Sequence, residues 1–436
     1  MTTKPKWHPK LAKYRASIEK RTKVRDVFVE ANQEIQCINT GSTVLNMLIG
    51  GSRLKNGKFL CPGWAKGSIN EIFGRESSGK STLALTALGH AVAAGGAGLY
   101  IDLECAVKDH YAIKLGADFR SPDLGGSGAA LRAQPRTFEE TEALTINAAL
   151  QGLDIVIIDS VAALVSGREM KRDVSDDKQK QGIAEVPRLM ANFLPKLQRI
   201  IAETGTVVLF LNQQRDKIGA VGRLEETLKS TTGGNALKFF ASTRILLKPR
   251  MSVKAKIWNP LINEQEDVYI STDIEVKMVK NKIDAKQGHS GLITIRYGVG
   301  VDELRTMLTV AERYNIISKT KNKQKREVFT FKSPKDSHVI EAIGSEKFRL
   351  EMTKQSEYLN EVIELSRNKI IEGYRMLDDE ELAALAEDAV TSYEHDDIDT
   401  DNSEYNDPRE PEIQDYGDLV SSDDGSVDFS SIDIDS

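Results

Sequence analysis

A phosphate-binding pattern constrains the fold of this chain more than any other sequence feature. Residues 74–81 read GRESSGKS and match the pattern G-x-x-x-x-G-K-[ST]. Residues 68–73 before it are predicted to form a strand, and residues 82–88 after it are predicted to begin a helix. Glycines at both ends let backbone N–H groups turn toward a polyphosphate, and the helix N-terminus adds its positive dipole end. The pattern therefore predicts a nucleoside triphosphate site between a strand and a helix.

The polar residues of this loop have separate expected tasks. We expect the Lys80 ammonium to reach the β- and γ-phosphates and the Ser81 hydroxyl to hold Mg²⁺. The loop residues expected to bind the nucleotide are Gly74, Glu76, Ser77, Ser78, Gly79, Lys80, Ser81 and Thr82.

From residue 37 to about residue 302, predicted strands alternate with predicted helices. Short apolar runs of the kind found in buried parallel strands occur at 98–102, 153–159 and 207–212. Helical periodicity marks residues 187–204, and polar–apolar alternation at 274–279 and 292–297 is typical of antiparallel edge strands. This order predicts an α/β fold with a mostly parallel, twisted sheet and helices on both faces.

Three further segments flank this predicted core. Residues 1–36 are basic and weakly periodic, which indicates a small helical element. In residues 303–376, apolar positions at helical spacing precede a basic stretch at 319–326 and then more helix, so we expect a small α/β domain. Residues 377–436 are rich in Asp and Ser and are expected to be disordered.

The net charge of −6 conceals a division between body and tail. Residues 377–436 contain 22 Asp and Glu residues and one Arg, so residues 1–376 carry a net charge of +15. A basic body with an acidic tail indicates a polyanion-binding surface with a tethered electrostatic competitor. A tail kept for solubility explains the same charge equally well.

Composition argues against a membrane or secreted protein. No apolar run approaches membrane-spanning length, and the first residues lack a secretory apolar region. Cys37, Cys61 and Cys105 show neither metal-ligand spacing nor a disulfide framework. We therefore expect a location in a reducing cytoplasm.

Phosphoryl transfer also requires carboxylates beside the loop. Asp159 ends the run at 153–159 and is expected to hold Mg²⁺, although an Asp there can also cap the next helix. Asp102 ends the run at 98–102 and Glu104 lies two residues later, and either can point at the γ-phosphate. Spacing alone does not decide which of the two carboxylates has this role.

Six sequence blocks resemble the bacterial RecA recombinase family. They occur in the family's order and approximate spacing, and the likeness weakens over residues 303–376. The blocks are residues 74–82 (GRESSGKST), 100–104 (YIDLE), 159–164 (DSVAAL), 212–215 (NQQR), 231–239 (TTGGNALKF) and 279–283 (VKNKI). The resemblance implies a RecA-like P-loop core that binds ATP and Mg²⁺.

The resemblance also implies roles for particular residues of the ATP site. Glu104 matches the glutamate that activates the attacking water, which decides between it and Asp102. Gln213 matches the residue that senses the γ-phosphate. Lys280 and Lys282 match lysines that reach the ATP site of the neighbouring protomer, although sequence alone would make them solvated positions on an edge strand.

On the base side of the site, Tyr111 matches an aromatic residue that stacks on adenine, and Tyr297 is assigned to the same nucleotide site.

Two loops are expected to contact DNA. Acidic residues offset the positive charges of both loops, so charge alone would make them ordinary surface loops. The resemblance implies instead that they bind the phosphate backbone of single-stranded DNA. The expected DNA-contacting residues are Arg168, Lys171 and Arg172 in the first loop, Arg215, Lys217 and Arg223 in the second, and Arg188, Gly233, Gly234 and Asn235 beside them.

The sequence departs from the family's pattern at several positions. The second loop is longer and lacks an aromatic residue, and Pro195 stands where the family has a second DNA-contacting arginine. Residues 53–66 form an insertion before the phosphate-loop strand, and Lys108 replaces a carboxylate that contacts adenine.

These features together predict an ATP-dependent homologous recombinase that forms helical filaments on single-stranded DNA and pairs it with a homologous duplex. The expected partners are further copies of the chain, both forms of DNA, and single-strand-binding and mediator proteins. Two alternatives use the same core: a hexameric helicase, and a coating protein that binds ATP without hydrolysing it. The blocks at 212–215 and 231–239 favour the recombinase over the helicase, and Glu104 argues against the coating protein.

Overall fold

The computed structural model describes residues 35–54, 58–171, 185–216, 229–231, 234–284 and 287–373, together with isolated positions between 10 and 17. Most of the expected N-terminal element and all of the acidic tail lie outside the described residues.

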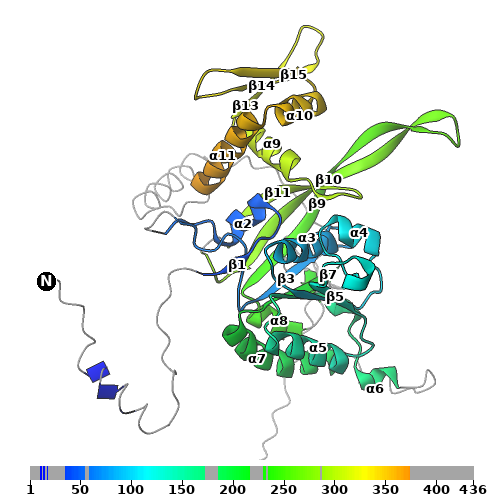
Figure 1. Cartoon of the computed structure of the whole chain (residues 1–436), viewed down its shortest axis with the longest axis vertical. Coiled ribbons are helices and arrows are strands. Elements are labelled where there is room, and N and C mark those ends of the chain that lie inside the picture. Colours follow the sequence, from blue (N-terminus) through cyan, green and yellow to red (C-terminus); the bar gives the residue numbers. More distant parts are fainter. Residues whose placement is uncertain are drawn as a thin grey trace, which may run out of the picture. The chain divides into compact units, whose positions relative to one another are not determined.

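A central sheet organises the core, and its order within the described residues is β12-β11-β10-β9-β3-β7-β6-β4-β5, with β8 paired to β7 (Figure 1). The strands β5, β4, β6, β7, β3 and β9 run parallel to one another, whereas β10, β11 and β12 continue the sheet in antiparallel pairs. The bounds are β3 Ile69–Gly74, β4 Gly98–Asp102, β5 Ala130–Ala133, β6 Ile155–Asp159, β7 Val207–Asp216, β8 Lys229–Thr231, β9 Thr243–Asn259, β10 Glu264–Asn281, β11 Ser290–Arg296 and β12 Gly300–Val301. The predicted mostly parallel sheet with antiparallel edge strands is confirmed.

Helices cover both faces of this sheet because successive side chains of each strand point to opposite sides. In β6, Ile155 and Ile157 pack in the cluster that contains α2 and α3, whereas Val156 and Ile158 pack in the cluster that contains α5 and α7. The helices of the core are α2 Thr43–Gly50, α3 Lys80–Ala93, α4 Asp109–Lys114, α5 Phe138–Leu150, α6 Gly167–Met170, α7 Glu185–Thr204 and α8 Gly234–Phe240. Burial on both faces explains why the strands read as continuous apolar runs.

Residues 303–373 contain a second, smaller sheet with helices beside it, and part of their apolar side chains form a separate cluster. The elements of this segment are α9 Glu303–Arg313, β13 Ile317–Lys321, β14 Glu327–Lys332, β15 Val339–Ile343, α10 Ser345–Lys354 and α11 Ser356–Gly373. The three strands form an antiparallel sheet in the order β13-β14-β15. The basic stretch at 319–326, which the sequence placed before more helix, is the β13–β14 hairpin, and a third strand precedes the next helix.

One feature of the fold was not predicted, a long ribbon formed by β9 and β10 (Figure 1). The two strands have 17 and 18 residues, but β9 pairs with β3 only up to Leu247 and β10 pairs with β11 only from Ser271 to Lys277. Beyond those positions they pair only with each other. The ribbon buries little apolar surface, so its sequence carries no buried-strand pattern.

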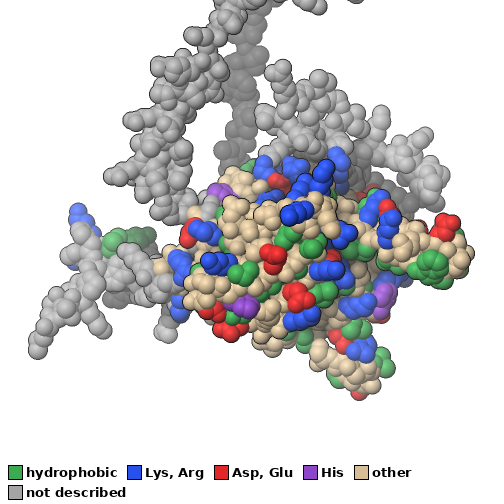
Figure 2. Space-filling model, turned by 90° about the horizontal axis from the view of Figure 1, so that it is seen from above, with side chains coloured by type: hydrophobic (Ala, Val, Ile, Leu, Met, Phe, Trp, Pro, Cys, Tyr) green, Lys and Arg blue, Asp and Glu red, His purple; other side chains and the backbone are tan. Residues whose placement is uncertain are grey.

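The surface mixes both signs of charge. In Figure 2, Lys and Arg side chains are spread over the visible face and alternate with Asp and Glu side chains.

None of the helices among the described residues combines the length and the apolar character needed to span a bilayer.

Helix α3 packs closely against the turn that follows α4, and a glycine makes this possible. A Cβ at Gly89 would lie 2.1 Å from the carbonyl oxygen of Leu115 and 2.9 Å from Cα of Gly116. We expect Gly89→Ala to lower the free energy of unfolding by about 1–3 kcal/mol, because two backbones must separate. Chemical unfolding measures the change. The control Ala93→Ser, on the exposed end of the same helix, should change it by less than about 0.5 kcal/mol, and equal effects would contradict this packing.

Candidate active site

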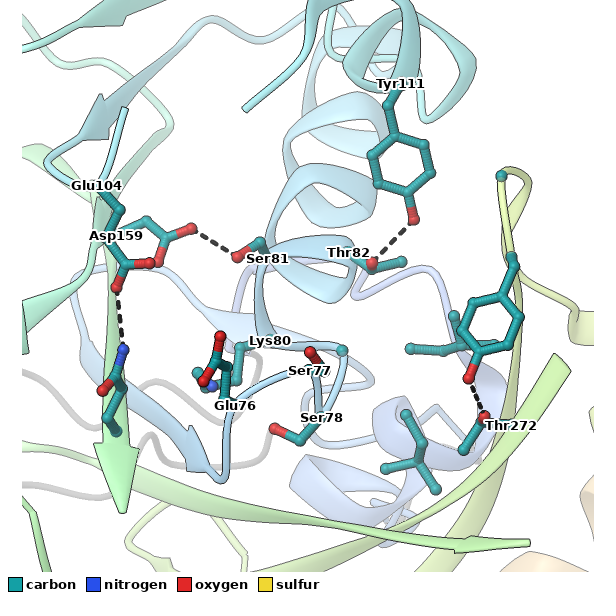
Figure 3. Close-up of a pocket in the computed structure, with 16 residues that line it drawn as sticks. Glu76, Ser77, Ser78, Lys80, Ser81, Thr82, Glu104, Tyr111, Asp159 and Thr272 are labelled. Carbon is teal, nitrogen blue, oxygen red and sulfur yellow. Dashed lines mark hydrogen bonds between the residues drawn. The ribbon is translucent and has the colours of Figure 1, made fainter. Parts of the chain in front are cut away.

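A cavity of about 360 Å³ lies at the carboxyl ends of the parallel strands, beside the phosphate loop (Figure 3). The loop connects β3 to α3, and β4, β6 and β7 end around it. The residues that line the cavity are Glu76, Ser77, Ser78, Gly79, Lys80, Ser81, Thr82, Glu104, Tyr111, Asp159, Gln213, Thr272, Ile274, Ile295, Tyr297 and Gly298. Ligands of open α/β sheets bind at this edge of the strands.

The loop requires glycine at both ends for different reasons. Gly79 has φ +88°, and a Cβ there would lie 2.4 Å from Cδ1 of Ile295. A Cβ at Gly74 would lie 2.6 Å from the carbonyl oxygen of Leu247 and 2.7 Å from Oγ of Ser78. Gly74 therefore shapes the loop from the end of β3 without lining the cavity itself.

Ser78 offers an observation that favours an anionic ligand. Its side chain is fully buried, it lines the cavity, and its Oγ has no hydrogen-bond partner among the described residues. A buried hydroxyl without a partner carries a desolvation cost that a ligand oxygen would remove. The loop residues therefore fit a phosphate group.

Lys80 is held inside the loop. Its Nζ donates a hydrogen bond to the carbonyl oxygen of Arg75 at 2.8 Å. Burial lowers the pKa of Lys80, and the negative charges of Asp159, Glu104 and Glu76 oppose that effect. A bound polyphosphate would add to this opposing effect and would compete with the Arg75 carbonyl for the ammonium.

Asp159 and Ser81 form the inner end of the cavity. Ser81 Oγ donates to Asp159 Oδ2 at 2.6 Å, and the Tyr100 hydroxyl donates to the same oxygen at 2.5 Å. Burial raises the pKa of Asp159, although these two hydrogen bonds act in the opposite direction. The hydroxyl and the carboxylate are the hard oxygen donors that Mg²⁺ prefers, and Mg²⁺ normally completes its shell with water and substrate phosphate. The described residues contain no cluster of three His, Cys, Asp or Glu side chains that could hold a metal without such a substrate.

Of the two carboxylates at the carboxyl end of β4, Glu104 lines the cavity and Asp102 does not. Glu104 Oε1 accepts hydrogen bonds from Ser160 Oγ and, at 3.3 Å, from Gln213 Nε2. Asp102 is buried, and its carboxylate accepts from the Ala106 N–H at 3.2 Å and from Gln134 Nε2 at 3.3 Å. Glu104 is therefore the carboxylate that a water molecule in the cavity can reach.

The opposite end of the cavity is aromatic and apolar. The Tyr111 hydroxyl hydrogen-bonds with Thr82 Oγ1 at 2.8 Å, and the Tyr297 hydroxyl with Thr272 Oγ1 (Figure 3). Four residues of this end were missed by the sequence analysis: Thr272, Ile274, Ile295 and Gly298. They come from β10, β11 and the turn after β11, and only the pairing register of those strands could have identified them.

Lys280 and Lys282 do not line this cavity. Lys280 Nζ donates to the carbonyl oxygens of Lys238 at 2.6 Å and Phe239 at 2.9 Å, and Lys282 Nζ donates to the Phe239 carbonyl at 3.2 Å. Both ammonium groups therefore lie at the C-terminal end of α8.

The residues expected to contact DNA are only partly described. Arg168, Lys171 and Arg188 are exposed on or beside α6 and α7, and Gly234 and Asn235 begin α8. The Arg168 guanidinium lies 3.8 Å from the Glu185 carboxylate. Arg172, Lys217, Arg223 and Gly233 lie outside the described residues, as does the side chain of Arg215 at the end of β7.

The sheet, the strand–loop–helix unit and the carboxylate that ends a neighbouring parallel strand define a mixed α/β protein of the phosphate-loop class. Residues 15–302 match the RecA N-terminal domain. The chain is 34% identical over 284 residues to Protein RecA of Mesoplasma florum (65% of this chain and 74% of the relative) and 35% identical over 287 residues to Protein RecA of Caulobacter vibrioides (66% and 70%). It is 30% identical over 358 residues to Protein RecA of Streptococcus pneumoniae (81% and 79%). The chain belongs to the RecA family.

The buried Asp159 carboxylate gives a prediction about stability. Because burial raises its pKa, its ionised form destabilises the nucleotide-free fold, and this cost grows as the pH rises through the folded pKa. We expect Asp159→Asn to raise the free energy of unfolding at neutral pH, with the difference disappearing as the pH falls below the pKa of an unfolded aspartate. Chemical unfolding across this pH range measures the effect.

The matched control is Asp154→Asn, at the other end of β6. Burial acts to raise the pKa of Asp154, but hydrogen bonds from Lys66 and the Ala97 N–H outweigh it, so the pKa is lowered. This substitution should therefore destabilise the protein at neutral pH and lose its effect as the pH falls. A destabilising Asp159→Asn at neutral pH would contradict the assignment.

Proposed function

We propose that this protein is an ATP-dependent homologous recombinase, which assembles into helical filaments on single-stranded DNA and pairs that strand with a homologous duplex. The observation that carries the proposal is the convergence of Ser81, Asp159, Glu104 and Gln213 on one cavity beside the phosphate loop, in a member of the RecA family. The activity comes from the likeness to relatives named Protein RecA.

In the proposed reaction, the loop N–H groups and Lys80 bind the β- and γ-phosphates. Ser81 and Asp159 would hold Mg²⁺, which supplies charge neutralisation at the phosphate oxygens when bound. Glu104 orients a water molecule and accepts its proton at a carboxylate oxygen. The Ser160 and Gln213 hydrogen bonds hold this carboxylate in the cavity.

Gln213 is proposed to report the state of the phosphates to DNA. Its side chain lies at the cavity, and β7 continues beyond it toward residues 217–228, the loop proposed to contact DNA. A change in the hydrogen bond between Gln213 and Glu104 would therefore alter the root of that loop.

The charges around the cavity support a site shared between two protomers. Among the described residues that line it, Lys80 is the one cation, against the carboxylates of Glu76, Glu104 and Asp159. A triphosphate adds several negative charges, which a single lysine and one Mg²⁺ leave uncompensated. Lys280 and Lys282 do not line their own cavity, and the resemblance to the RecA family assigns them to the cavity of a neighbour in the filament.

Two single substitutions in the cavity test ATP binding and ATP hydrolysis separately. We expect Lys80→Ala to abolish ATP hydrolysis, because the phosphates lose their cation. Glu104→Gln should bind ATP normally but reduce single-stranded-DNA-stimulated hydrolysis at least ~100-fold, since the general base is lost. Steady-state hydrolysis and fluorescent-nucleotide binding measure the two effects, and wild-type turnover by either variant would contradict the proposed chemistry.

A mixing experiment tests the shared site. Glu104→Gln and the double variant Lys280→Met/Lys282→Met should each be inactive on single-stranded DNA. An equimolar mixture should recover about one quarter of the wild-type rate, because that fraction of heterologous interfaces joins an intact Glu104 to intact lysines. The control mixture combines Glu104→Gln with Lys80→Ala. Both substitutions damage the cavity side of an interface, so every interface in this mixture has a defective cavity and the mixture should remain inactive. Recovery in neither mixture, from variants that still assemble on DNA, would contradict a shared site.

A further inference from the structure

Glu71 is a carboxylate in the middle of a buried parallel strand. All residues of β3 are buried, and the Glu71 side chain has no exposed surface. A buried carboxylate is tolerated only when its oxygens have partners. Both Glu71 oxygens do: Oε1 accepts from Asn212 Nδ2 at 2.9 Å, and Oε2 accepts from Arg244 Nε at 2.5 Å. Glu71 therefore joins β3 to the strands on both of its sides.

On the β7 side, the network leads to the cavity. Asn212 is fully buried, and its Oδ1 accepts the backbone N–H of Gln213 at 2.9 Å. The Gln213 side chain then donates to Glu104 at 3.3 Å. Glu71 therefore fixes the side-chain amide of Asn212, and the oxygen of that amide accepts the backbone N–H of Gln213.

On the β9 side, the network leads to the lysines. Glu71 is in register with Arg244 across β3 and β9, and Arg244 is in register with Lys280 across β9 and β10. Residues paired in register point to the same face, so one negative and two positive side chains follow one another across three strands. Arg244 also lies over the Phe73 ring, 4.8 Å from its centroid, and has a side chain only 12% exposed.

We infer that Glu71 is a positioning residue that links Gln213 on one side to the Lys280 ammonium on the other. This inference rests on the proposed function, because the Lys280 end acts on ATP only in a filament. Glu71 balances the charge of Arg244, which would otherwise disfavour the protonated form of Lys280. Burial lowers the pKa of Lys280, Lys282 and Arg244 lower it further, and Glu71 opposes them. The carboxylate thereby keeps a cation available for the neighbouring triphosphate.

Glu71→Gln tests the charge link in the full-length protein. The isosteric amide can still accept from Asn212, but it leaves Arg244 uncompensated. The pKa of Lys280 should fall by about one unit, measured by ¹³C NMR titration of the reductively methylated, nucleotide-free protein, with the signal assigned by its loss in Lys280→Arg. The alkaline limb of DNA-stimulated ATP hydrolysis should move to lower pH by the same amount.

Three further variants separate this effect from loss of structure. Glu71→Gln/Arg244→Gln removes both buried charges without leaving either unpaired, and it should return the Lys280 pKa to at least the wild-type value. Glu275→Gln neutralises a carboxylate on β10 that pairs with Arg250 outside the network, and it should shift neither readout. Asn212→Ala should lower the rate about 10- to 100-fold through Gln213 and leave the Lys280 pKa unchanged.

An unchanged Lys280 pKa in folded Glu71→Gln, or a rate loss that is equal at every pH, would overturn the inference. A wild-type protein that hydrolyses no ATP on single-stranded DNA would overturn the proposed function and the catalytic part of this inference with it. In that case the NMR titration still decides whether Glu71 sets the charge state of Lys280.

Discussion

The parallel pairing of β3 with β7, of β7 with β6 and of β6 with β4 is the constraint on which the site depends. These strands are in register, so their carboxyl ends form one edge of the sheet. Asp159 at the end of β6 therefore lies within a hydrogen bond of Ser81 in the first turn of α3. Glu104, which follows β4, and Gln213 near the end of β7 meet at the same edge. Without this pairing, residues more than a hundred positions apart in sequence would share no cavity.

Two buried carboxylates of this sheet, Glu71 and Asp159, differ in how their negative charges are stabilised. Both oxygens of Glu71 have hydrogen-bond partners inside the protein, and Arg244 balances its charge. Asp159 instead accepts hydrogen bonds from two neutral hydroxyl groups, and burial raises its pKa. The fold therefore contains one buried carboxylate with an ion-pair partner and another whose hydrogen bonds come from neutral hydroxyl groups. An imbalance of this kind is typical of a group that meets a cation when its ligand binds.

The sequence predicted those parts of the fold and site whose signals are local. The phosphate loop is one continuous motif, and β4, β6 and β7 are continuous apolar runs because both of their faces are buried. Thr272, Ile274 and Ile295 escaped prediction because their place in the cavity depends on how β10 and β11 pair with each other. Glu71 escaped it too, since a single carboxylate in a strand has no meaning until Asn212 and Arg244 lie beside it. The β13–β14 hairpin was read as a basic stretch between helices because the exposed positions of β13 are Ser, Lys, Thr and Lys rather than alternating apolar residues.

Strand pairing also limits how the two ends of the Glu71 network can communicate. A strand that changes its register by one residue turns every side chain to the opposite face, so β3, β7 and β9 cannot slide past one another without disrupting both apolar clusters. Communication between Gln213 and Lys280 must therefore pass through charge and side-chain orientation within a fixed backbone. A carboxylate with one oxygen on each neighbouring strand meets that requirement. It transmits an electrostatic change in either direction while the sheet that holds both sites stays intact.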